Sequence, residues 1–224
     1  MKQLIQAVLV ATAILTSSAV TAFAADPAVS HVNGSINIAA DQHAGKLSTV
    51  NGSIDVAARA TVGSMHSVNG HQTLGDGATA AEMSTVNGAI ELGKGARVTG
   101  ALHAVNGSLN LAPGAQVGGG ASNVNGNIDI DGAHVVGRVA TVGGNITLSN
   151  SARLDGGILV QKPTGFSFSF KPAVPRIVIG VGCSVAGTLK FERDVKLYIS
   201  DQATILGKIE GATPITFTGA TPPR

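Results

Sequence analysis

The segment Val86-Asn87-Gly88-Ala89-Ile90-Glu91-Leu92 is the fullest copy of a motif that recurs along this sequence. Successive copies begin 18 or 19 residues apart. The tripeptide Val-Asn-Gly that opens each copy starts at Val32, Val50, Val68, Val86, Val105 and Val124. A degenerate seventh copy reads Val142-Gly143-Gly144. A fixed period over this many copies is the signature of a repeat architecture.

Apolar and polar residues alternate within each copy. The fourth and sixth residues after the valine are apolar, as in Ile90 and Leu92, and only Gln72 departs from this rule. A second apolar pair follows, as in Ala96 and Val98. Alternation with a period of two predicts short, half-buried β-strands. The Asn-Gly and Gly positions between them are typical of turns.

These features predict an all-β fold, a single-stranded parallel β-helix (β-solenoid) with about 18 residues per coil. Equivalent strands of successive coils would stack about 4.8 Å apart. Val, Ile, Leu and Ala are expected to face the interior, which is too thin for aromatic rings, and residues 26–160 contain no aromatic residue. A β-sandwich of hairpins is the alternative, but hairpins rarely impose one side-chain pattern on seven consecutive units.

The asparagine of each motif is expected to stand at one corner of the coil. There its amide can bond to the equivalent amides of the neighbouring coils. We expect this turn ladder to be structural and not a ligand site. Its members are Asn33, Asn51, Asn69, Asn87, Asn106 and Asn125.

The chain divides into five regions. Residues 1–24 have the layout of a secretory signal peptide, with Lys2, an apolar run and small residues before Ala25. Residues 25–160 carry the solenoid repeats, and residues 161–176 form an insertion containing Pro and Phe. The solenoid pattern returns over residues 177–211. Residues 212–224, with Pro214, Pro222 and Pro223, are expected to leave the parallel ladder as a cap or tail.

The charge balance, hydropathy and cysteine content argue against nucleic acid binding, a membrane span in the mature chain and a reactive thiol. Without residues 1–24 the chain keeps 14 of its 15 basic residues and all 13 acidic ones, a net charge of +1. Basic residues are not concentrated into the dense stripe that binding to nucleic acid needs. No segment after the signal peptide is apolar enough to span a membrane. Cys183 is the only cysteine and is expected to be a buried apolar residue, because it stands where Ala152 and Ala203 stand in other coils.

The pattern of Ala, an apolar residue two positions later, Gly, and a further apolar residue resembles the polymer-forming bactofilin family. The resemblance covers residues 96–160 and 176–211. It implies a right-handed triangular β-helix whose subunits join end to end without a nucleotide, and it implies no catalytic residues. A signal peptide differs from the usual cytosolic setting of that family. The repeated Val-Asn-Gly also resembles secreted, adhesin-like β-solenoids of bacteria.

Three acidic residues occupy outward positions of the predicted coils. Asp55, Glu91 and Asp129 fall on alternate coils, about 9–10 Å apart by the strand spacing. That separation touches the upper limit for an inverting glycosidase. Spacing that keeps like charges apart explains these positions better.

The remaining polar residues suggest no catalytic or metal site. His66 and His103 share a slot two coils apart, too far to bind one metal ion. Asp129 and Asp131 offer too few oxygens for Ca²⁺. No histidine is singled out as the base of a hexapeptide acyltransferase, which also uses an 18-residue coil. We expect no cofactor.

The leading hypothesis is a non-enzymatic, secreted scaffold or adhesin-like protein of the periplasm or cell surface that self-associates through its solenoid ends. The alternative is a carbohydrate-active β-helix enzyme that uses the outward carboxylates. A third hypothesis concerns Phe166, Phe168 and Phe170, whose rings share one side of an extended strand. They are expected to form a lid on the solenoid or, less favoured, an interface for an envelope partner.

Overall fold

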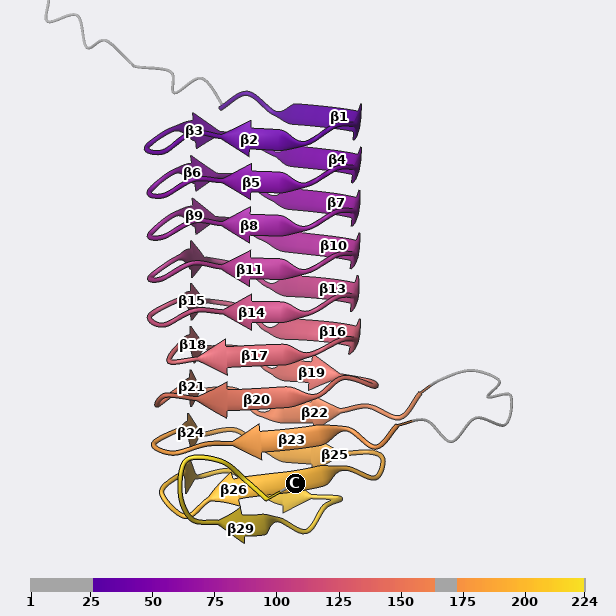
Figure 1. Ribbon diagram of the computed structural model, residues 1–224, viewed down its shortest axis with the longest axis vertical. Coiled ribbons are helices and arrows are strands. Elements are labelled where there is room, and N and C mark those ends of the chain that lie inside the picture. Colours follow the sequence, from indigo (N-terminus) through magenta and orange to yellow (C-terminus); the bar gives the residue numbers. More distant parts are fainter. Residues whose placement is uncertain (1–25, 164–172, 224) are drawn as a thin grey trace, which may run out of the picture.

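The computed structural model describes residues 26–163 and 173–223, and every regular element in them is a β-strand. The strands form three parallel sheets. Each coil contributes one strand to each sheet in turn, except that the last described coil has no strand in the third sheet. Figure 1 shows the coils stacked along one axis, with the N-terminal coil at one end and the C-terminal coil at the other. The predicted all-β parallel β-solenoid is confirmed.

Sheet 1 holds the strand before each Val-Asn-Gly corner, and sheet 2 the strand after it. Sheet 1 consists of β1 (Val29–Asn33), β4 (Leu47–Asn51), β7 (Met65–Asn69), β10 (Met83–Asn87), β13 (Leu102–Asn106), β16 (Ala121–Asn125), β19 (Val139–Thr141), β22 (Ile158–Val160), β25 (Leu189–Phe191) and β28 (Ile209–Glu210). Sheet 2 consists of β2 (Ile36–Ile38), β5 (Ile54–Val56), β8 (Gln72–Leu74), β11 (Ile90–Leu92), β14 (Leu109–Leu111), β17 (Ile128–Asp131), β20 (Ile146–Ser149), β23 (Arg176–Ile179), β26 (Lys196–Ser200) and β29 (Ile215–Phe217).

Sheet 3 closes each coil with a two-residue strand. It consists of β3 (His43–Ala44), β6 (Thr61–Val62), β9 (Thr79–Ala80), β12 (Arg97–Val98), β15 (Gln116–Val117), β18 (His134–Val135), β21 (Arg153–Leu154), β24 (Ser184–Val185) and β27 (Thr204–Ile205). Equivalent residues of successive coils are paired, so that Ile90 lies beside Gln72 on one side and Leu109 on the other. The sequence period is therefore also the hydrogen-bonding register.

The interior is a continuous apolar column built mainly from small and aliphatic side chains. Phe191 of the C-terminal coils is also buried in it, so the expectation that the interior is too thin for aromatic rings is wrong there. Leu102, Leu109, Ala115 and Val117 of one coil are all inaccessible to solvent. Gln72, which departs from the apolar pattern, is also fully buried. Its Nε2 donates hydrogen bonds to Ser67 Oγ at 3.0 Å and to Ser84 O at 2.6 Å. These bonds satisfy the donor side of the buried amide, whereas Gln72 Oε1 has no hydrogen-bond partner among the described residues.

The Val-Asn-Gly corner requires glycine because the coils are so close there. Gly88 has a φ of +156°, and a Cβ on it would overlap the carbonyl oxygen of Gly70 on the preceding coil. That carbonyl is held from the inside by Thr85 Oγ1, which donates to it at 3.3 Å. The corner is therefore fixed by a backbone contact that only glycine permits.

The predicted insertion begins and ends at this same corner. The chain leaves β22 at Val160 and enters β23 at Arg176, the two strands that flank the position of Asn-Gly in earlier coils. Arg176, which the sequence assigned to the insertion, is the first residue of β23. The solenoid then continues in register, because Ile177 pairs with Ile146 and Ile158 with Leu189.

The expectation that residues 212–224 leave the parallel ladder is wrong for three of them. Ile215–Phe217 form β29 and pair in parallel with β26. Pro214 precedes this strand and Pro222 follows it, so neither removes a ladder donor. The chain then turns back along the outer face of sheet 2 (Figure 1). Arg176 Nη2 donates a hydrogen bond to Pro223 O at 2.9 Å.

Candidate functional site

The six motif asparagines form one exposed ladder at the corner between sheets 1 and 2. Each Nδ2 donates to the Oδ1 of the preceding asparagine, from Asn51 to Asn33 through to Asn125 to Asn106. The five donor–acceptor distances lie between 2.9 and 3.1 Å. Each interior amide therefore donates one hydrogen bond and accepts one within the stack. These bonds join the coils along the corner.

The motif valines form a second exposed ladder beside the asparagines. Val50, Val86 and Val124 are 39%, 40% and 38% exposed, and Val32 on the first coil is 68% exposed. The expectation that valines face inward is wrong for these residues. Leu47 and Thr49 of the same strand are buried, so alternation along a strand directs Val50 outward. The sequence contains a signal for this orientation. An apolar residue stands three positions before each valine, and residues three positions apart on a strand face opposite sides.

The three candidate carboxylates lie on the outer face of sheet 2 on alternate coils. Asp55 and Glu91 are both register partners of Thr73, and Asn110 separates Glu91 from Asp129. Two strand spacings separate neighbouring acids, about 9.6 Å along the axis. A shallow depression bordered by Pro113 brings Glu91, Asp129 and Asp131 to one surface. Asp131 is already engaged, since it accepts a hydrogen bond from Ser149 Oγ at 3.2 Å.

Histidine and serine alternate on the outer face of sheet 1. His66 Nδ1 lies 2.6 Å from Ser84 Oγ, and His103 Nδ1 lies 2.6 Å from Ser122 Oγ. Since Ser84 pairs with both His66 and His103, the two imidazoles are two coils apart. Within residues 26–163 and 173–223, no three His, Cys, Asp or Glu residues are grouped closely enough to hold a metal ion.

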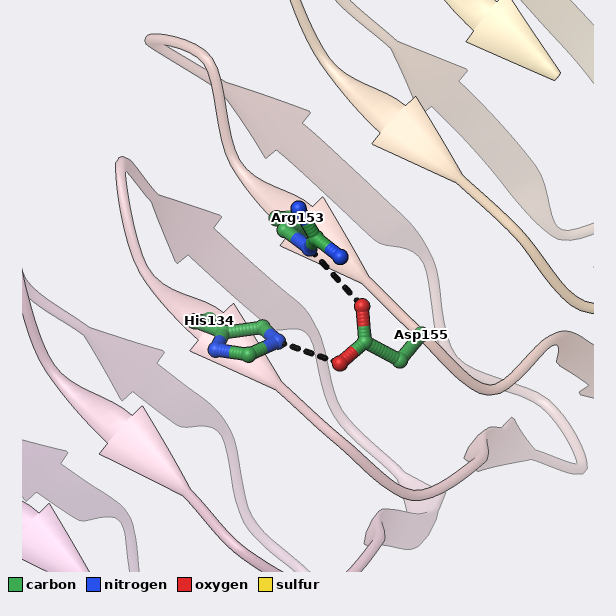
Figure 2. Close-up of polar contacts among 3 residues, drawn as sticks. All are labelled: His134, Arg153 and Asp155. Carbon is green, nitrogen blue, oxygen red and sulfur yellow. Dashed lines mark hydrogen bonds and ion pairs between the residues drawn. The ribbon is translucent and has the colours of Figure 1, made fainter.

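His134, Arg153 and Asp155 form a polar cluster that sequence reasoning missed (Figure 2). His134 Nε2 lies 2.7 Å from Asp155 Oδ2, and Arg153 Nε donates to Asp155 Oδ1 at 2.8 Å. Arg153 foremost, and then His134, lower the pKa of the Asp155 carboxyl below its ordinary value. Sequence offered no direct signal, because register places His134 beside Arg153 only once the two coils are stacked.

Other predicted residues are placed as follows. Cys183 is fully buried, as expected, and burial raises the pKa of its thiol, which disfavours a reactive thiolate. Phe166, Phe168 and Phe170 lie outside the described residues, as do residues 1–24, for which the sequence predicts a signal peptide. The part of the chain that the structure describes contains no helix with the length and apolar character to cross a membrane.

Comparison with known proteins adds no identification. No protein-family model, curated protein or solved structure matches this chain.

Proposed function

We propose that this protein is a non-enzymatic structural β-solenoid of the bacterial cell envelope that self-associates end to end. One observation carries the proposal: each of the three sheets ends in a strand that is paired on one side only among the described residues. An unpaired strand edge is a template for another chain. Three such edges at each end offer a second subunit a complete coil to continue.

The N-terminal end presents the edges of β1, β2 and β3. His31 is exposed there, although its register partner Thr49 is buried. Val29 and Ile38 are only partly buried, whereas Leu47 and Val56 in the next coil are buried. Among the residues that the structure describes, part of the interior is therefore open at this end, and stacking another coil would cover it.

The C-terminal end presents the edges of β27, β28 and β29. Leu206 is 75% exposed there, and Ile205 and Ile209 are partly buried. The final residues do not cross this end, because Arg176 holds Pro223 against the outer face of sheet 2. Both ends therefore combine free strand edges with apolar side chains.

Ser30 provides a test of the N-terminal edge. In a parallel sheet, successive residues direct their N–H groups to opposite sides. Val29 N donates to Lys46 O at 2.8 Å on the next coil, so Ser30 N–H points to the open edge. Ser30→Pro removes this donor and leaves the pairing of β1 with β4 intact. Ser30→Ala keeps the donor and is the matched control.

The experiment is sedimentation and negative-stain electron microscopy of the purified chain without residues 1–24, over a range of concentrations. We expect oligomers or filaments for wild type and Ser30→Ala, and a shift to monomer for Ser30→Pro with an unchanged circular dichroism spectrum. A wild-type chain that stays monomeric at the highest concentration would refute self-association. A rigid scaffold would remain, detectable as a monomeric rod.

The secretory layout of residues 1–24 supports placement in the envelope. The absence of aromatic residues from 26–160 argues against the stacking platforms that sugar-binding solenoids use. Fractionation of cells that express the full chain tests the location. We expect the processed chain in the periplasm or on the cell surface, and recovery of the unprocessed chain in the cytosol would contradict it.

A carbohydrate-active enzyme is the second candidate, because one depression brings Glu91 and Asp129 to a common surface. In this hypothesis the two carboxyl groups would flank a glycosidic bond as acid and base. Wild-type release of reducing ends from an envelope or plant polysaccharide, abolished in Asp129→Asn, would favour the enzyme. Equal rates in both proteins would remove this candidate.

A further inference from the structure

The six Asn-Gly dipeptides of the corner ladder are chemically equivalent in sequence but not in the structure. An asparagine followed by glycine can lose its amide when the glycine backbone nitrogen attacks the side-chain carbon Cγ. The attack needs a free N–H and a side chain able to turn toward it. Hydrogen bonds to either group oppose the reaction until the site opens locally.

Five of the six glycine N–H groups are engaged. Gly34, Gly52, Gly70, Gly88 and Gly107 each donate to the carbonyl oxygen of the next motif asparagine, at distances from 2.9 to 3.2 Å. The side chain of each interior asparagine is also held on both sides by its neighbours in the ladder. Attack at these positions requires that neighbouring coils separate.

Asn125 is the last member of the ladder and differs in both respects. The next coil has Gly143 at the equivalent position, so no asparagine amide follows to donate to Asn125 Oδ1. The corner bonds differently there, since Gly143 N donates to Val124 O at 2.9 Å. Among the described residues, the N–H of Gly126 donates no hydrogen bond. Nucleophile and target are therefore least restrained at this one dipeptide.

We propose that Asn125-Gly126 is a site of spontaneous modification, at which the asparagine converts to aspartate and isoaspartate while the other five motif asparagines are protected. The Gly126 nitrogen forms a bond to Cγ of Asn125 and loses its proton to solvent. The bond from Cγ to Nδ2 breaks, and ammonia leaves. Water then opens the resulting succinimide at either carbonyl and yields aspartate or isoaspartate.

The surroundings of Asn125 can accommodate the new carboxylate. Asn125 borders a surface depression that Lys162, Arg193 and Glu192 also line. The two basic side chains outnumber the one acid, so the local charge balance favours a new carboxylate. The exchange also removes the Nδ2 donor that Asn125 gives to Asn106 Oδ1 at 2.9 Å. The ladder would then lose its last bond and end one coil earlier.

The test is peptide mapping by mass spectrometry of the folded chain aged in mildly alkaline buffer, with isoaspartate detected by enzymatic methylation. We expect conversion at Asn125 about tenfold or more faster than at Asn69, Asn87 or Asn106. The unfolded chain in denaturant is the internal control, and there all six dipeptides should react at similar rates. Similar rates in the folded chain, or Asn87 reacting as fast as Asn125, would overturn the proposal.

Gly143→Asn gives a second test, since it completes a Val-Asn-Gly motif and extends the ladder by one coil. A Cβ at Gly143 would lie 3.3 Å from Asn125 Oδ1, and the exposed Asn125 side chain can adjust. We expect this variant to slow conversion at Asn125 and to move the fastest site to position 143. Unchanged conversion at Asn125 in a folded variant would contradict the role of the ladder end.

Discussion

Replacing Gly88 with alanine tests whether the close approach of the coils at the Val-Asn-Gly corner makes glycine necessary. A Cβ at this position would overlap the carbonyl oxygen of Gly70, and φ is +156°. The strained backbone costs about 1–3 kcal/mol. Moving the coils apart would also weaken the bond from Gly70 N to Asn87 O and the amide bond from Asn87 to Asn69, at about 1 kcal/mol each. The free energy of unfolding should fall by about 3–5 kcal/mol.

Gly95→Ala is the matched control for this substitution. Gly95 also has a positive φ, of +64°, but a Cβ on it would meet no atom within 4 Å. Alanine at position 95 should lower the free energy of unfolding only by the cost of the left-handed backbone, roughly 1 kcal/mol. The difference between the two variants therefore measures the contact between coils.

Urea unfolding followed by far-ultraviolet circular dichroism measures both variants against wild type under the same conditions. We expect the midpoint to fall further for Gly88→Ala than for Gly95→Ala, with the slope of the transition unchanged. Equal midpoints for the two variants would refute the reasoning, because the corner could then admit a side chain without cost.

Three further predictions concern the core, the polar cluster and the thiol. Leu109→Ala, at a fully buried position, should destabilise the chain by about 2–5 kcal/mol in urea unfolding, whereas Val105→Ala on the exposed ladder should cost less than about 1 kcal/mol. The pKa of Asp155 is lowered in the fold, so the stability that its carboxylate contributes is fully present at pH values above the ordinary pKa of Asp. This stability is lost as the pH falls through the pKa in the folded state. The stability difference between wild type and Asp155→Asn should therefore shrink in acid. Cys183 should react with iodoacetamide only in denaturant, as measured by mass, and rapid labelling of the folded chain would contradict its burial.

The coil repeat could be predicted from sequence because register and period are the same quantity in this fold. Spacing alone placed Asn87 beside Asn69 and Asp129 beside Asn110, and the structure pairs both. Burial could be predicted where alternation was unambiguous, as at Ile90 and Leu92.

Burial and strand pairing were predicted wrongly where the prediction depended on residue type and not on the position of the residue in its strand. The motif valines are apolar and were expected to face inward. Val50 instead follows the buried Thr49 in its strand, and alternation directs it to solvent. Proline content suggested that the C-terminal residues leave the ladder, yet Pro214 stands just before β29 and interrupts no pairing. The contact between His134 and Asp155 depends on side-chain rotamers across two coils, which no spacing rule specifies.

Because the coils stack in constant register, the length of this molecule changes in steps of one coil. Each added or deleted repeat of 18 residues, such as residues 65–82, would change the rod by about 4.8 Å and leave the pairing rules of the remaining coils the same. Gene duplication within the repeat region could therefore tune the distance between the two ends without designing a new core. The distance between the two ends of the solenoid is therefore set by the number of coils.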